Sequence, residues 1–253
     1  IDKYAMDDGL DLDDNDTTDH VYSTDNYGAL ILDNNGDAHV FYGVMKYGDD
    51  DLADESSSWY PATNMIAYWN ESFGPDYSDT LLKDTINYID ASGIITPRGV
   101  WWSDMMNNHI VTAAPDLNGD GDVSGIDSTG GYALYYASRA SMPNAGLDAA
   151  GNIWLSFSGY TETADNGTQV FRHIYVTKSE DGGTTWSCPS DVTPHNNFSG
   201  MQESVFGSMS PVVDNKIRMI YQQDFEPGLA IRGDEDMVDI NNIIYLEIDT
   251  VDT

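Results

Sequence analysis

The segment Ser179–Trp186 (SEDGGTTW) determines the fold class that we predict for this chain. It follows the run His173–Thr177 (HIYVT), whose β-branched and aromatic residues are typical of a strand. Asp181 can accept hydrogen bonds from turn amides, Gly183 can adopt a positive φ, and Trp186 can pack against a core. Together these positions predict a β-hairpin closed by a turn that contains Asp and Gly.

Similar strands recur along the chain after turns that begin with an apolar residue and an Asp. These turns are LDNNG, LDAAG and VDN at Leu32–Gly36, Leu147–Gly151 and Val213–Asn215. Two strands are predicted after each turn. They are His39–Met45, Met65–Trp69, Ile153–Ser158, His173–Thr177, Ile217–Gln222 and Ile243–Ile248. The chain is therefore predicted to repeat an antiparallel meander, with about four recognisable units.

The repeated meanders favour a β-propeller, either complete or part of a larger one, with a β-sandwich as the alternative all-β fold. We assign residues 1–26 to an acidic N-terminal arm or connection and residues 27–253 to the propeller-like domain. Gly99–Ala140 is expected to hold a further, interrupted unit, and Asp79–Asp90 is the one candidate helix. The motifs at Ser141–Pro143 and Ser208–Pro211 are expected to occupy matching places in two units.

Five positions of the opening segment fit the pattern S-x-D-x-G-x-T-W. They are Ser179, Asp181, Gly183, Thr185 and Trp186. The pattern resembles the Asp-box, or BNR repeat, of sialidase-type β-propellers. The resemblance implies a propeller fold and a structural role for the motif away from an active site, so it assigns no catalytic residue here.

A second motif, DLNGDGDVSGID at 116–127, resembles the calcium loop of EF-hand and dockerin-type sites. Oxygen ligands at alternate positions can converge there because Gly121 allows a sharp turn. The predicted ligands are Asp116, Asn118, Asp120, Asp122, Ser124 and Asp127. Asp127 is shorter than the usual closing Glu, and a solvated acidic turn is the alternative interpretation. The motif predicts Ca²⁺ as a cofactor, in an insertion near 116–127.

The formal net charge of −33 restricts the partners of the chain. Of its 43 acidic residues 35 are Asp, which favours turns and metal loops over helices. Nucleic acid and anionic lipid are excluded as partners because their phosphates would be repelled. No apolar run is long enough to insert into a membrane. Cations, and calcium above all, are the expected counter-charge, with halophilic adaptation as the competing explanation.

We expect an extracellular or cell-surface location, in a prokaryote, because millimolar calcium can there replace disulfides. Cys188 stands alone, so no internal disulfide can form, and we expect it to be buried. The chain is a candidate for part of a larger protein or assembly. Its expected partner is a glycan or another cell-surface protein.

The first hypothesis for function is a non-catalytic, calcium-binding module. The alternatives are a sialidase-like glycoside hydrolase and a structural segment of a larger surface adhesin or filament. The Phe/Tyr-Arg-Ile-Pro pattern of the sialidase family is missing, and no catalytic residue is assigned. Three converging Arg would favour the enzyme, exposed aromatics would favour glycan binding, and a flat apolar face or unpaired edge strand would favour assembly.

Overall fold

The computed structural model describes residues 21–48, 58–73, 81–89, 95–103, 109–117, 119, 123, 135–194, 201–230 and 238–251. These ranges are all-β, as the sequence predicts, with a short 3₁₀ helix, η2 (Glu71–Phe73), and no α-helix. Within them no helix is long and apolar enough to cross a membrane. Strand β1 (Val21–Leu32) begins inside the stretch that the sequence assigns to the N-terminal arm, so residues 21–26 form part of the first sheet.

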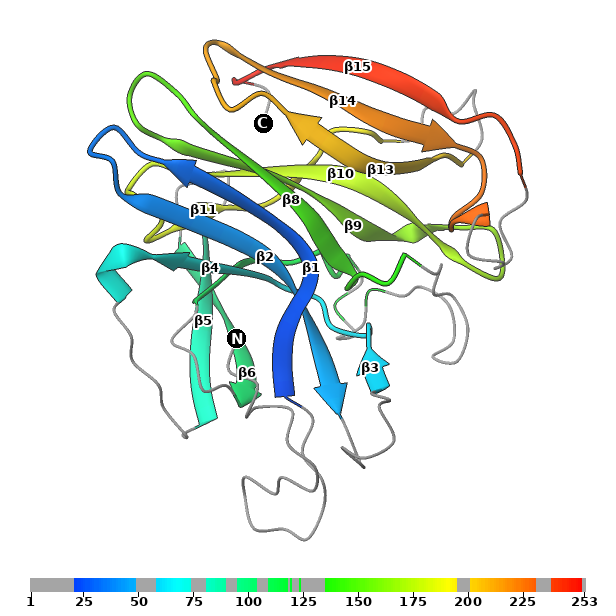
Figure 1. Ribbon diagram of the computed structural model, residues 1–253, viewed down its shortest axis with the longest axis horizontal. Coiled ribbons are helices and arrows are strands. Elements are labelled where there is room, and N and C mark those ends of the chain that lie inside the picture. Colours follow the sequence, from blue (N-terminus) through cyan, green and yellow to red (C-terminus); the bar gives the residue numbers. More distant parts are fainter. Residues whose placement is uncertain are drawn as a thin grey trace, which may run out of the picture.

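Four sheets make up the described part of the chain (Figure 1). The first contains β1, β2 (Ala38–Gly48), β3 (Ser58–Tyr60), β4 (Ile66–Asn70) and β7 (His109–Thr112). The second contains β5 (Leu81–Ile89), β6 (Ile95–Ser103) and β11 (Trp186–Ser187). The third contains β8 (Ala140–Leu147), β9 (Ile153–Asp165), β10 (Val170–Ser179) and β12 (Ser190–Asp191). The fourth contains β13 (Glu203–Met209), β14 (Lys216–Asp224) and β15 (Asn242–Asp249).

The third sheet lies between the first and the fourth and is buried on both faces (Figure 1). Successive side chains of a strand point to opposite faces, so β9 contributes to two cores. Leu155 and Phe157 pack toward the first sheet, whereas Trp154 packs toward the fourth. This explains why β9 and β10 are nearly continuous runs of buried residues rather than alternating apolar and polar ones.

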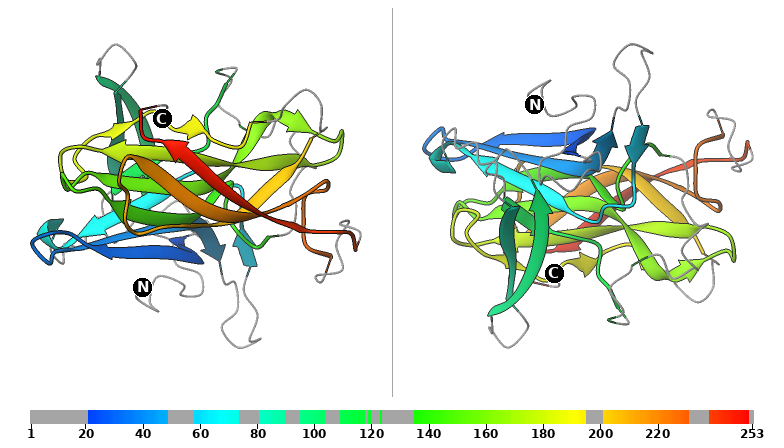
Figure 2. Two further views of the ribbon diagram at one scale, coloured as in Figure 1. Left: turned by 90° about the horizontal axis from the view of Figure 1, so that it is seen from above. Right: turned by 90° about the horizontal axis from the view of Figure 1, so that it is seen from below.

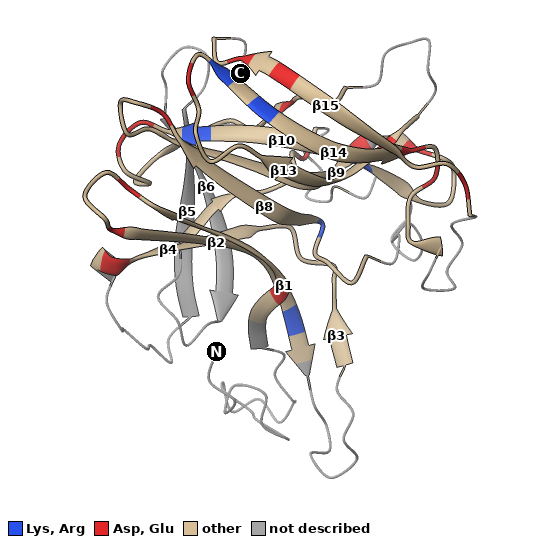
Figure 3. Cartoon of the chain, turned by 45° about the horizontal axis from the view of Figure 1, so that its top comes forward, with Lys and Arg blue, Asp and Glu red and all other residues tan. Residues whose placement is uncertain are grey.

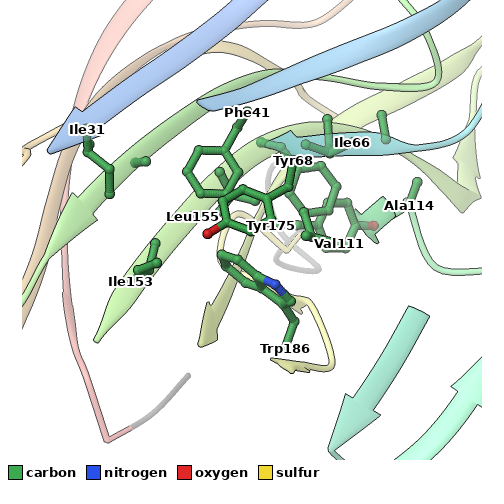
Figure 4. Packing of buried hydrophobic residues seen from close by; sticks show 13 residues of the cluster. Ile31, Phe41, Ile66, Tyr68, Val111, Ala114, Ile153, Leu155, Tyr175 and Trp186 are labelled. Atoms are coloured by element: carbon green, nitrogen blue, oxygen red, sulfur yellow. The ribbon is translucent and has the colours of Figure 1, made fainter. Parts of the chain in front are cut away.

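The larger core joins the first and third sheets to the turn after β10 (Figure 4). Phe41 and Tyr68 stack with their ring centroids 4.9 Å apart. Trp186 meets both rings edge-on, at 5.7 Å from Phe41 and 6.0 Å from Tyr68. Aromatic pairs in such geometries add stability beyond the area they bury, so Trp186 fastens its turn to the first sheet.

Three strands that open a meander share an irregularity that the sequence analysis missed. The pairing of β1, β8 and β13 with the following strand is interrupted by a bulge. Each bulge contains a non-glycine residue with positive φ, namely Asn26 (74°), Met142 (56°) and Phe206 (54°). Met142 therefore corresponds to Phe206, and the expected match between Ser141–Pro143 and Ser208–Pro211 is wrong.

The region 79–140 also differs from the prediction. Residues 81–89, expected to be helical, form strand β5, because they pair in antiparallel register with the whole of β6. Cross-strand pairing here overrides a weak helical pattern. Within Gly99–Ala140 the described strands do not form a further meander, since β6 belongs to the β5 hairpin and β7 completes the first sheet. Figure 2 shows the β5–β6 hairpin projecting from the body of the other sheets.

The architecture shown by these elements is several antiparallel sheets packed face to face. Such packing is common to sandwiches and to neighbouring blades of a propeller. The single parallel pairing among the described strands joins β11 to β5. The turns after β1 and β8 lie at the same side of their sheets, beside the turn after β10 (Figure 1).

Candidate functional site

The turn Ser179–Trp186 makes the hydrogen bonds that its sequence predicts. Asp181 accepts hydrogen bonds from the amides of Thr184 and Thr185 at 3.1 and 2.8 Å and from the Thr185 hydroxyl at 2.7 Å. The Ser179 hydroxyl donates to Asp181 at 2.8 Å, and Gly183 has a φ of 93°. Burial opposes ionisation of Asp181, but these hydrogen bonds outweigh it and lower the pKa of its carboxyl.

The repeated Asp turns have the same local design. Asp33 accepts from the amides of Asn35 and Asp37, each at 2.8 Å. Asp148 accepts from the amides of Ala150 and Asn152, each at 2.9 Å. Both aspartates therefore belong to repeat turns, as predicted. The hydrogen bond from Asp37, with those from Asn35, lowers the pKa of Asp33.

A cavity of about 430 Å³ lies where the first Asp turn, the end of β4 and the turn Ser179–Trp186 meet. Polar and acidic groups line it: Asp33, Asp37, His39, Asn70, Glu71, Ser72 and Gly182. This volume falls within the range of about 300–1,000 Å³ that is typical of small-molecule sites. Figure 3 shows acidic residues at the same ends of β1, β2 and β4. The sequence analysis did not predict this site.

The wall of the cavity is ordered by Tyr68. Its hydroxyl lies 2.6 Å from His39 Nδ1 and 3.3 Å from the Gly182 carbonyl oxygen, and it receives a hydrogen bond from Asn70 Nδ2 at 2.9 Å. A Cβ atom at Gly183 would overlap this hydroxyl, so only glycine lets the turn approach Tyr68 so closely. Burial, together with the charges of Asp33 and Asp181, raises the pKa of Tyr68, which therefore stays a neutral phenol.

His39 lines the same cavity and has a second ring nitrogen, Nε2. The residue is 6% exposed, and its Nε2 has no hydrogen-bond partner among the described residues. The nearest acidic oxygen, Asp33 Oδ2, is 3.9 Å away. This distance is too long for a hydrogen bond. Because buried polar atoms are normally satisfied, Nε2 indicates a place for a ligand atom or a water.

The predicted calcium loop is only partly described. Asn118, Asp120, Asp122, Ser124 and Asp127 lie outside the described residues. Of the described positions, Asp116 accepts a hydrogen bond from the Gly119 amide at 2.6 Å, and Val123 is buried against Tyr160 and Val170. In the part of the chain that the structure describes, no three His, Cys, Asp or Glu side chains are arranged to hold a metal ion.

A separate polar network lies at the bulges of the opening strands and is sealed from solvent. Asp25, in the β1 bulge, accepts from the Ser138 amide at 3.0 Å, the Ser138 hydroxyl at 3.1 Å and the Ser141 hydroxyl at 2.5 Å. Tyr27 donates its amide to the other carboxylate oxygen at 3.1 Å. Burial raises the pKa of Asp25, although the hydrogen bonds oppose this.

Arg172 and Glu203 continue the network at the third and fourth sheets. Arg172 donates to the carbonyls of Ser138, Arg139 and Ser158 at 2.7, 3.3 and 3.4 Å. The Glu203 carboxylate accepts from the Arg172 amide at 2.5 Å and is fully buried. Burial raises the pKa of Glu203 to about 8. With no exposed surface, the carboxyl cannot meet a substrate in this conformation.

The arginines do not form the three-residue cluster of a sialidase in the described part of the chain. Arg172 donates to the backbone carbonyl of Arg139, but Arg218 lies on β14 and pairs with Asp214 and Glu247 at the surface. Arg232 lies outside the described residues, and the side chain of Arg98 is not described either. Cys188 is exposed rather than buried, and it directly follows β11, which ends at Ser187.

The outer face of the fourth sheet is partly apolar. Ile220 of β14 lies opposite Tyr245 of β15, and Ile243 follows on the same face. All three are exposed. Lys216 and Arg218 on this face form ion pairs with acids of β15, where Figure 3 shows basic residues on β14.

Comparison with known proteins gives weak matches only. No protein-family model and no curated protein matches the chain. It is similar to a protein of unknown function from Dyadobacter fermentans, with a TM-score of 0.45 and 12% identity over 92% of this chain and 53% of that one. It is also similar to a family 117 glycoside hydrolase from the marine bacterium Zobellia galactanivorans, with a TM-score of 0.36 and 15% identity over 87% and 52% of the two chains. The chain spans about half the length of both, and similarity at this level assigns no activity to it.

Proposed function

We propose that the chain is a calcium-binding, non-catalytic module of a prokaryotic cell surface or secreted protein, with sialidase-like propeller architecture, and that it binds a glycan. The propeller is supported by the bulges repeated in β1, β8 and β13 and by the Asp turns that follow two of these strands. The hydrogen bonds of Asp181 support the interpretation of Ser179–Trp186 as an Asp-box.

The calcium proposal rests on the first and the eighth positions of the loop 116–127, Asp116 and Val123, which both make contacts that hold the loop in place. Asp116 caps the first turn through Gly119, and Val123 is buried, as the apolar eighth position of a calcium loop requires. Leu117 also donates its amide to Glu162 at 2.6 Å. Bound Ca²⁺ would bring its ligands' carboxylates together and offset their mutual repulsion.

Thermal unfolding with calcium and with a chelator tests this proposal. Chelation is expected to lower Tm, because an ion that binds only the folded state stabilises it. Asp120→Ala should remove much of that dependence, whereas Asp249→Asn, which removes an acid from the exposed edge of β15, should keep it. Equal Tm values with calcium and chelator would overturn the proposal, and rescue by sodium chloride alone would favour halophilic adaptation.

The second candidate function is a sialidase-like glycoside hydrolase, and the raised pKa of Glu203 favours it. A carboxyl that is protonated near neutral pH can act as a general acid. The full burial of Glu203 and the separation of Arg218 from Arg172 favour the first proposal, a non-catalytic module. A panel of fluorogenic glycosides, with calcium present, separates the two. Turnover that is lost in Glu203→Gln would replace the first proposal by the second.

A further inference from the structure

The cavity lined by His39 indicates what kind of glycan the module binds and where it binds. We propose that it binds hydroxyl groups of a neutral saccharide, with His39 Nε2–H as donor and the carboxylates of Asp33, Asp37 and Glu71 as acceptors. This inference rests on the glycan-binding part of the proposed function. It does not involve the loop 116–127.

The state of His39 follows from its contact with Tyr68. The Tyr68 hydroxyl has one proton, and His39 Nδ1 lies much closer to it, at 2.6 Å, than the Gly182 carbonyl at 3.3 Å. A neutral His39 therefore accepts at Nδ1 and carries its proton on Nε2. A protonated His39 carries a proton on both nitrogens, so Nε2 is a donor in either case. His39 is more than nine-tenths buried and lines the cavity, and its Nε2 has no hydrogen-bond partner among the described residues.

The acidic groups that line the cavity supply acceptors only. Asp37 is exposed, and Glu71 uses one oxygen to accept the Ala38 amide at 3.3 Å. Asp33 keeps Oδ2 facing the imidazole at 3.9 Å. A hydroxyl group can accept from Nε2–H and donate to a carboxylate at the same time. Neighbouring hydroxyls on a sugar ring repeat this pattern, so a saccharide satisfies both kinds of group.

Other ligand classes match these groups less well. An anion would be repelled by three carboxylates, and an ammonium or guanidinium group has no acceptor for Nε2–H. A metal ion is disfavoured because the described His and acidic side chains do not converge in groups of three. Neutral hydroxyls are the class that remains.

The site is preformed rather than assembled by the ligand. His39 and Tyr68 lie nearly parallel, with an interplanar angle of 13°. Asn70 accepts from the amide and the hydroxyl of Ser72 at 2.9 and 2.6 Å, which holds the start of η2 against β4. Rigid donors and acceptors lose little entropy when a ligand binds.

Ligand-observed NMR of the calcium-loaded, full 253-residue chain tests the inference. The probes are the methyl glycosides of galactose, glucose, mannose and fucose, with galactose 6-sulfate and glucosamine as charged comparators. At least one neutral glycoside is expected to bind, and the sulfated sugar is expected to bind worst. Binding of glucosamine alone, of the sulfated sugar alone, or of no sugar would overturn the inference.

Variants then locate the site. His39→Phe keeps an aromatic ring but removes Nε2, and it should weaken the bound glycoside about tenfold or more in Kd. Asp37→Asn and Glu71→Gln are surface changes that leave folding intact, and each should weaken binding in the same direction. The matched control, Asp249→Asn, removes an equal charge from the distant fourth sheet and should bind like the wild type.

The outcomes separate this inference from the proposed function. If a glycoside binds the wild type and all three cavity variants equally, this site is wrong and glycan binding by the module stands. If His39→Phe unfolds, Asp37→Asn and Glu71→Gln decide alone. If no glycoside binds, the glycan proposal falls with the site, whereas the calcium proposal still depends on the chelation experiment.

Discussion

The His39 cavity and the Asp25–Glu203 network are both polar and acidic, yet they differ in what completes their hydrogen bonds. Asp25 accepts four hydrogen bonds from protein groups, and Arg172 donates to three backbone carbonyls. At the cavity, His39 Nε2 has no hydrogen-bond partner among the described residues and lies 3.9 Å from Asp33 Oδ2. The Asp25 carboxylate is thus fully paired, whereas Arg172 Nε and Glu203 Oε1, like His39 Nε2, have no hydrogen-bond partner among the described residues. Of these three residues only His39 lines the cavity.

This difference gives a criterion for distinguishing a structural polar cluster from a binding site. A raised pKa alone would have selected Glu203, because functional carboxyls often have one. Burial raises the pKa of a structural carboxyl in the same way. An unsatisfied atom on a residue that lines a cavity is the more specific observation, because a ligand can approach it there, whereas Arg172 and Glu203 do not line this cavity.

The largest expected effect is on the buried Asp25–Glu203 network. Arg172→Met keeps the side-chain volume but leaves the carbonyls of Ser138, Arg139 and Ser158 without their donor and Glu203 without a neighbouring positive charge. We expect the free energy of unfolding to fall by about 3–5 kcal/mol. Urea denaturation measures it. The matched change Arg218→Met, on the outer face of β14, should have little effect; similar losses in both variants would show that the network is not special.

The next effect is the pH dependence that Glu203 imposes. Its pKa of about 8 in the folded protein lies above the ordinary 4.5, so between these values the folded state holds a proton that the unfolded state releases. Stability should therefore fall as the pH rises from about 5 to 8. Glu203→Gln stays neutral, and its urea-unfolding free energy should decline less over the same interval. Parallel curves for the two proteins would contradict the buried, protonated Glu203.

Local features of this fold were predictable, because a few neighbouring residues encode them. Asp181, Asp33 and Asp148 form their turn hydrogen bonds within four residues of the chain. The strands after the Asp turns were also correctly placed, because alternation and β-branched residues mark them. The calcium ligands, apart from Asp116, lie outside the described residues, so that motif remains a prediction.

Features that depend on distant residues were not predictable. Asp25 meets Ser138 and Ser141 across more than a hundred positions, and nothing local marks it as buried. The bulges contain Asn26, Met142 and Phe206 in a conformation that favours glycine. Because none of them is glycine, the residue types do not indicate where the bulges lie. His39 was visible as the first residue of the strand predicted after an Asp turn, but its partner Tyr68 comes from another strand.

A smaller effect is expected where the network needs space. A Cβ atom at Gly43 would overlap the Asp25 carboxylate, so Gly43→Ala should cost about 1–3 kcal/mol. The same change in an Asp25→Ala background should cost much less, since the overlapping atoms are gone. Urea denaturation of the two single variants and the double variant gives the coupling energy. Strict additivity would mean that Gly43 does not make room for Asp25.

The smallest effect on stability is expected at the cavity. Tyr68→Phe removes the hydroxyl that joins His39, Asn70 and the Gly182 carbonyl, at a cost of about 1–2 kcal/mol. Its effect on His39 should be clearer, because Nδ1 loses the group that directs the proton to Nε2. The ¹⁵N shifts of the His39 ring should move toward a mixture of tautomers, while Tyr245→Phe, an exposed change on β15, leaves them alone. Unchanged His39 shifts in Tyr68→Phe would mean that another group sets the tautomer, and the donor at the cavity would lose its physical basis.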